Sequence, residues 1–223
     1  MSGGGPELNI PSGRRHRRIP RKTAVMRAAL ASVLGIGLAS GAASAAANAN
    51  GFLLRPGEQP GFTVKGKPTT ESTLKSFLAS MDLSVSQQKT YEKRFARAGF
   101  ILASGELLAA SKGRQGFSEV VEFRRRTSAR EAAASFLAVT RSAQGTAKVS
   151  GFTVPGIPSV RGITARGGTT TATANAYWYT GTCMLGSGLY LPHGAKESNA
   201  QIDRAVISGI ESQERRMKQD CPT

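Results

Sequence analysis

The chain has 223 residues, of which 39% are hydrophobic and 6% are aromatic. This composition excludes wholesale disorder, and the length left after removal of an export segment is that of one ordinary domain. The 30 Lys and Arg residues outnumber the 14 Asp and Glu residues, for a formal charge of +16. A positive charge favours anionic partners such as lipid headgroups, acidic wall polymers or acidic proteins. Nucleic acid is also anionic but is an unlikely partner for an exported chain.

The N-terminus has the pattern of an export segment. Basic residues between Arg14 and Arg27 precede an uncharged stretch, 28–47, that ends in small residues offering A-x-A cleavage sites. This pattern predicts a secretory signal peptide over residues 1–47. The alternative is an uncleaved anchor, because about 20 uncharged residues can just span a bilayer. The first cysteine is Cys183, so no N-terminal lipid anchor is expected, and the mature form should have no stable transmembrane span.

Two helices are predicted early in the domain. Residues 48–68 are rich in Gly, Pro and Asn and are interpreted as a linker and turn-rich lead-in to a single domain over 69–223. Apolar spacing predicts a short helix over about 70–81. A second helix, the most basic, should run from about 84 to 98 and end at Gly99.

Strand-like runs at 100–110 and 117–124 should pair as an antiparallel hairpin. Ser128 and Glu131 have capping-box spacing, which predicts a helix start at Ser128. Further strands are predicted at 148–154, 160–165, 169–179 and 183–191, and a last helix at about 198–219. This order predicts an α+β fold, an antiparallel sheet with helices packed mainly on one face.

The two cysteines, Cys183 and Cys221, are expected to pair, because an exported chain lies in a compartment where disulfides persist. Cys221 lies four residues after Met217, on the side of the last helix expected to face the sheet, so the bond would clamp that helix to the sheet. Free thiols or a metal site are the alternatives. Two cysteines and one histidine do not make a zinc set, so no metal or cofactor is expected.

No catalytic constellation is recognisable, and no catalytic residue is assigned. His193 is the one histidine after residue 47, and no G-x-S-x-G elbow accompanies it. Glu119 and Glu122 are three residues apart on a predicted strand and should point to opposite faces. Glu211 and Glu214 are expected on an exposed helix surface. Phosphate-loop, dinucleotide and metal-ligand motifs do not occur in the sequence.

Two sets of residues are candidates for a binding surface. In the strand ending at Tyr179, the alanines and Trp178 share one face, which should accept a closely packed helix. Tyr177 and Tyr179 share the other face and either bind a sugar or peptide or pack under a loop or second helix. Cations on the basic helix and at the end of a strand could form one patch, and the alternative is an ordinary solvated surface; they are Lys93, Arg94, Arg97, Arg124, Arg125 and Arg126.

Several segments resemble small exported actinobacterial proteins of uncharacterised function. They are the stretch from Leu54 to Phe62, the stretch from Gly151 to Pro158 with Arg161-Gly162, and the aromatic strand before a Gly-rich turn. The likeness spans most of the chain after the export segment. That group is similar in layout to extracytoplasmic sensor or lipoprotein-like domains, which implies a sheet flanked by helices and suggests ligand or partner binding.

The leading hypothesis is a secreted or envelope-associated, non-enzymatic module that binds an anionic lipid, wall polymer or protein. The alternative is an extracytoplasmic hydrolase with an unfamiliar site that uses His193 or a glutamate. A purely structural or secreted factor is a third hypothesis. The sequence does not specify an oligomeric state.

Overall fold

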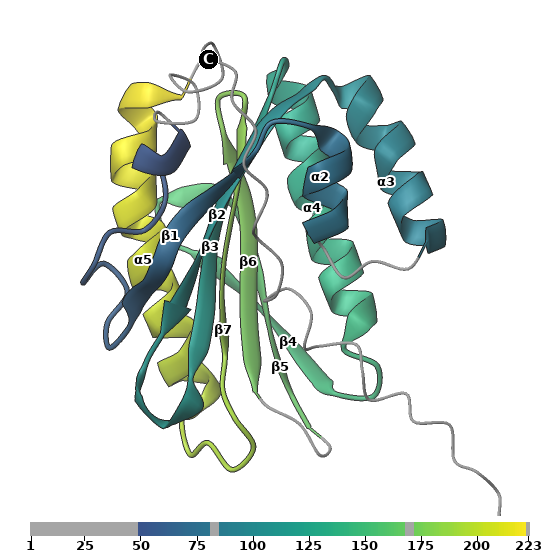
Figure 1. Cartoon of the computed structure of the whole chain (residues 1–223). Helices are drawn as coiled ribbons and strands as arrows, with labels where there is room; N and C mark the ends of the chain where they lie inside the picture. Colours follow the sequence, from purple (N-terminus) through teal and green to yellow (C-terminus); the bar gives the residue numbers. More distant parts are fainter. Residues whose placement is uncertain (1–48, 81–84, 168–171, 222–223) are drawn as a thin grey trace, which may run out of the picture.

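The computed structural model describes residues 49–80, 85–167 and 172–221 (Figure 1). Its centre is a seven-stranded antiparallel sheet in the order β1-β2-β3-β7-β6-β5-β4. The predicted export segment and the first residues of the predicted strand 169–179 lie outside the described residues. The strands are Thr63–Glu71 (β1), Phe100–Ala109 (β2), Gln115–Phe123 (β3), Lys148–Val154 (β4), Ile157–Arg166 (β5), Thr173–Thr180 (β6) and Cys183–Tyr190 (β7).

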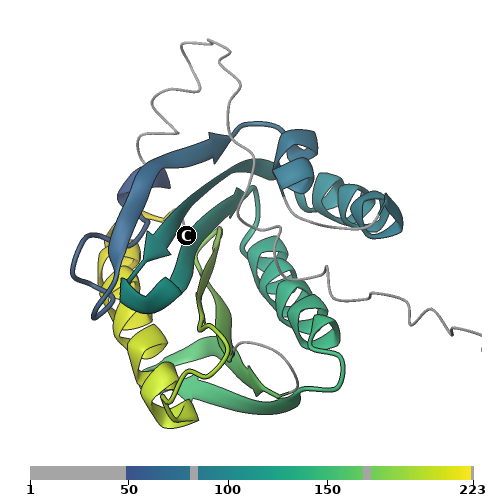
Figure 2. The same ribbon diagram turned by 60° about the horizontal axis from the view of Figure 1, so that its bottom comes forward.

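The α+β class and the concentration of helices on one face are confirmed. Three helices, α2 (Leu74–Ser80), α3 (Val85–Ala98) and α4 (Arg126–Ala143), pack on one face, and α5 (Asn199–Asp220) packs on the other (Figure 1). Figure 2 shows α4 and α5 on opposite sides of the curved sheet. The helices therefore sandwich the sheet and leave a hydrophobic core on each of its faces.

The α5 core follows the predicted pattern. A stripe of α5 residues is fully buried against the small side chains of β6 and Trp178, which has no exposed surface. The alanines of β6 let the helix approach the sheet, as expected. The stripe is Ile202, Val206, Ile210 and Met217. The opposite core is aromatic: Phe95 of α3 stacks on Phe136 of α4 with ring centroids 5.6 Å apart, and Phe136 also lies 5.5 Å from Tyr177 of β6.

Two predicted helix starts need correction. The helix expected over 70–81 begins at Leu74, because Thr69–Glu71 instead pair with Ala103–Gly105 as the end of β1. α4 begins at Arg126 and not at Ser128. The chain remains extended through Arg125, whose carbonyl accepts from the amides of Ser128 and Ala129, and Ser128 is buried. A complete capping box occurs instead at the start of α5, between Ser198 and Gln201.

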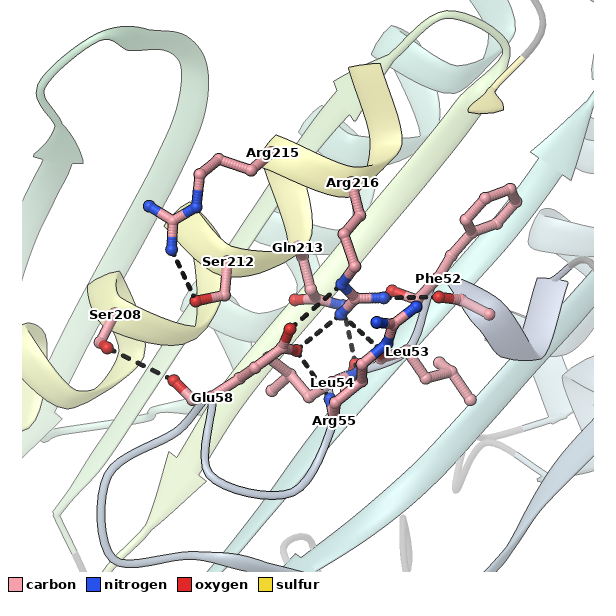
Figure 3. Close-up of polar contacts among 12 residues, drawn as sticks. Phe52, Leu53, Leu54, Arg55, Glu58, Ser208, Ser212, Gln213, Arg215 and Arg216 are labelled. Atoms are coloured by element: carbon pink, nitrogen blue, oxygen red, sulfur yellow. Dashed lines mark hydrogen bonds and ion pairs between the residues drawn. The ribbon is translucent and has the colours of Figure 1, made fainter. Parts of the chain in front are cut away.

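Residues 48–68 were expected to form a linker and a turn-rich lead-in. Residues 52–61 are indeed rich in turns, but residues 49–62 pack on α5 and residues from Thr63 onward form β1. We call residues 49–62 the N-terminal strap. Its Leu53 and Leu54 are buried at 2% and 3% exposure. The Arg216 guanidinium binds Glu58 at 2.6 Å and the Leu53 carbonyl at 2.8 Å, and it also binds the Gly51 carbonyl (Figure 3). The strap is therefore an integral part of the folded domain.

The expected disulfide is present between Cys183 and Cys221, whose Cα atoms are 6.3 Å apart. Cys183 is the first residue of β7 and Cys221 directly follows α5. The bond therefore fixes the C-terminal end of α5 to the end of the sheet where β3 and β6 also end, because Cys183 is paired with Glu122 on one side and Thr180 on the other.

Candidate functional site

Helix α3 exposes its cations because its apolar residues face inward. Tyr91 and Phe95 are buried, at 6% and 1% exposure. Lys93, Arg94 and Arg97 lie on the exposed side of the helix. The Arg94 Nη1 atom donates to Ser135 Oγ of α4 at 2.7 Å, so this cation bridges the two helices.

The other three predicted cations lie at the junction between β3 and α4, and all are exposed. The Arg124 amide donates to the Gly99 carbonyl at 2.9 Å, which places this junction directly against the end of α3. Gly99 has φ +75°, and a Cβ there would meet the Arg124 side chain at 3.0 Å, so glycine is required for this close approach.

All six predicted cations are therefore exposed, three on α3 and three on the adjoining β3–α4 junction, although Arg94 contacts α4 at Ser135, nine residues after its start. We call the set Lys93, Arg94, Arg97, Arg124, Arg125 and Arg126 the basic end. The exposed acids Glu92 and Glu131 on the same helices leave it positive overall. Neither ion pair recorded between described side chains, Arg114–Glu197 or Arg216–Glu58, includes a residue of the basic end.

The two predicted tyrosines differ in position. Tyr177 is 7% exposed and lies under α4, with its hydroxyl 3.2 Å from Thr140 Oγ1. Burial, followed by the nearby Glu119 carboxyl, raises the pKa of Tyr177 well above its usual value. Tyr177 is therefore a core residue, which was the second of the two possibilities considered for this face. Tyr179, two residues further along β6, is half-buried at the end of the strand.

Tyr179 and Arg126 line one shallow pocket of about 340 Å³. The turn between β4 and β5 and the first residues of β5 form one wall, Gly156–Ser159, and α5 contributes Glu214. Glu214 was expected on an exposed helix surface, but it is only 6% exposed and accepts a hydrogen bond from Trp178 Nε1 at 3.2 Å. The expectation was wrong because the helix surface bearing Glu214 faces the end of β6.

The pocket and the basic end are continuous through Arg126. An arginine offers a planar fork of donors that matches phosphate and carboxylate groups. A tyrosine offers an apolar ring with one polar group. Together these residue types suit an anionic group carried on a larger, partly apolar ligand. The sequence indicated Arg126 and Tyr179 separately, but nothing in it indicated that the Gly156 turn or Glu214 would join them.

The residues considered for catalysis lie apart. His193 lines a second pocket, of about 520 Å³, between the β2–β3 hairpin and the loop before α5, together with Glu197. Glu119 lies instead over Gly186 in the middle of the sheet, and burial raises its pKa to about 7. Among the described residues, no group of three or more His, Cys, Asp or Glu could hold a metal ion.

No protein-family model matches the chain, and no curated protein matches it. Several solved structures match it, including the following two. The extracellular domain of PknH from Mycobacterium tuberculosis is 14% identical, with 76% of this chain and 96% of that chain covered and a TM-score of 0.45. A putative uncharacterized protein from Mycobacterium smegmatis is 11% identical, with 71% and 90% covered and a TM-score of 0.39.

Proposed function

We propose that this chain is a non-enzymatic extracytoplasmic module that binds an anionic component of the cell envelope through its basic end. The observation that supports the proposal is that six exposed cations lie on α3 and on the β3–α4 junction, which is hydrogen-bonded to the end of α3. No ion pair between described residues neutralises them. A concentrated positive surface attracts anionic partners and raises their rate of association.

Two observations support an extracytoplasmic location. The first 47 residues have the pattern of an export signal or anchor. The Cys183–Cys221 bond belongs to an oxidising compartment, since cytosolic thiols are kept reduced. Within the described ranges, no helix is long and apolar enough to cross a membrane.

The pocket beside Tyr179 supports binding as the activity. Arg126 brings the charge of the basic end into the pocket, and Tyr179 supplies a surface for an apolar part of the ligand. The disulfide and the Trp178–Glu214 hydrogen bond hold the surrounding elements together. A wall of this kind is preorganised, which reduces the entropy lost on binding.

The test compares two triple variants that remove the same charge from different surfaces. In the first, Arg124, Arg125 and Arg126 are replaced by glutamine; in the control, the exposed Lys65, Lys67 and Lys148 are replaced by glutamine. Binding is measured by co-sedimentation with purified cell envelopes and by titration with soluble dextran sulfate, each at low and high salt.

We expect the first variant to bind at least about tenfold more weakly at low salt, since three exposed charges each contribute a fraction of a kcal/mol to about 1 kcal/mol. The control variant should bind almost as the wild type does, and high salt should weaken the wild type steeply. Equal losses in the two variants, or binding that does not respond to salt, would contradict the proposal.

A further inference from the structure

One large apolar side chain is exposed beside the basic end. Ile101 is 38% exposed, and the other exposed large apolar residue in the described chain is Val85, at the opposite end of α3. Ile101 lies two residues after Gly99, whose carbonyl binds the Arg124 amide. Arg97, in the last turn of α3, precedes it by four residues, and Arg124, just after β3, is joined to the chain next to it through the Gly99 bond.

The exposure of Ile101 results from an irregularity in β2. Phe100 pairs with Phe123 but Leu102 pairs with Glu122, so the register shifts between them. In a regular strand, residues two apart share one face. Here Phe100 packs in the aromatic core with α2, whereas Leu102 is buried in the α5 core on the other face. Ile101 is the extra residue that lets its two neighbours enter opposite cores, as in a β-bulge.

The edge strand does not cover this position. The pairing of β1 with β2 ends at Glu71, opposite Ala103. The start of β2 therefore extends past the end of β1, and Ile101 lies at an uncovered corner of the sheet. Bulges commonly re-aim a side chain at sheet edges and next to functional sites.

We infer that the basic end docks on the surface of an anionic lipid bilayer, with Ile101 inserted below the headgroups and Arg97 and Arg124 at the level of the phosphates. This inference rests on the proposed function and narrows its partner to lipid. An aliphatic side chain among cations suits a bilayer surface, because the apolar group enters the acyl region while arginine side chains reach the headgroups. A soluble wall polymer would use the charges and leave Ile101 in water.

The decisive experiment places a fluorescent reporter at the proposed insertion point. The only native tryptophan, Trp178, has no exposed surface, so lipid-borne quenchers should not reach it. Ile101→Trp is mixed with phosphatidylglycerol–phosphatidylcholine vesicles that contain brominated acyl chains, and Val85→Trp is the matched control. We expect blue-shifted and quenched emission from the residue-101 tryptophan, no change from that at residue 85, and no change for either with pure phosphatidylcholine.

A second variant measures the contribution of the native side chain. Ile101→Ser should bind the anionic vesicles about threefold to tenfold more weakly, as expected for removal of part of an aliphatic side chain from a burial site. Its binding to dextran sulfate should not change and its melting temperature should change little, because Ile101 is exposed.

The outcomes separate the two proposals. If the Arg124–Arg126 variant loses dextran sulfate and vesicle binding but the residue-101 tryptophan is not quenched, the lipid inference is wrong and an anionic polymer or protein is the partner. If wild-type protein binds neither anionic vesicles nor dextran sulfate, the proposed function itself fails. Quenching at residue 85 as strongly as at residue 101 would also overturn the proposed orientation.

Discussion

The replacement of Glu106 by glutamine should stabilise the protein at alkaline pH. Glu106 lies on β2 opposite Ser118, beneath the N-terminal strap, and is 7% exposed. Burial raises its pKa from 4.5 to about 7, and the repulsion from Glu58 adds to this, while attraction to Arg216 and the Leu54 amide acts in the opposite direction. The buried Glu106 Oε1 atom has no hydrogen-bond partner among the described residues.

The sign of the effect follows from proton linkage. Between about pH 4.5 and 7 the folded protein retains the Glu106 proton while the unfolded chain has lost it, so Glu106 makes folding less favourable as pH rises through this range. Each pKa unit corresponds to about 1.4 kcal/mol, so ionisation of Glu106 can lower the free energy of unfolding by at most about 3 kcal/mol. Residual solvent contact reduces the expected cost to about 1–2 kcal/mol. Glutamine keeps the shape of the side chain and never ionises.

Urea unfolding followed by Trp178 fluorescence measures this effect. We expect Glu106→Gln to exceed the wild type in free energy of unfolding by about 1–2 kcal/mol at pH 8.5 and to be nearly equal to it at pH 4.5. Glu131→Gln, at an exposed position on α4, is the control and should change little at either pH. A Glu106→Gln variant that is less stable than the wild type at pH 8.5 would show that the ionised carboxylate stabilises the strap and would refute the reasoning.

Two further predictions concern the attachment of α5. Arg216→Ala removes two contacts with the Glu58 carboxylate, at 3.1 and 2.6 Å, and leaves it with the Arg55 amide but without its cationic partner. We expect the free energy of unfolding to fall by about 2–4 kcal/mol and hydrogen exchange to accelerate first in residues 49–62. Uniform acceleration across the domain would contradict a local role. Replacement of both Cys183 and Cys221 by alanine removes a cross-link between residues 38 positions apart. It should lower the free energy of unfolding by about 4 kcal/mol. Thermal unfolding with and without reductant checks this, because only the wild type should respond to reductant.

Elements with strong periodicity were predictable from the sequence. The apolar stripe of α5 and the alanine face of β6 each specify their partner, because both patterns repeat over several turns or residue pairs. β1 was missed, since Gly66 and Pro68 give it the composition of a linker and its pairing with β2 shifts register between Lys65 and Thr69. An edge strand of this kind is determined by its partner strand and not by its own residues.

The candidate site was predictable in its charges but not in its geometry. Runs such as Arg124–Arg126 indicate an exposed basic surface whatever the fold of the chain. By contrast, Tyr177 and Tyr179 have equivalent positions in the sequence pattern, and only the course of α4 over β6 separates a core residue from a surface residue. Ile101 was not identifiable at all, because its exposure depends on Phe100 and Leu102 entering different cores.

The three arginines before and at the start of α4 also have an energetic cost that indicates function. The N-terminus of a helix carries partial positive charge, which favours acidic residues there, yet α4 has no acid in its first turn and its N-cap makes no side-chain hydrogen bond. The replacement of Arg124, Arg125 and Arg126 by glutamine should therefore stabilise the protein by about 0.3–1 kcal/mol while it weakens binding to anionic vesicles. Urea unfolding of the triple variant measures the first effect. If the variant is instead less stable than the wild type, the arginines support the fold, and their concentration at this end would no longer point to a partner.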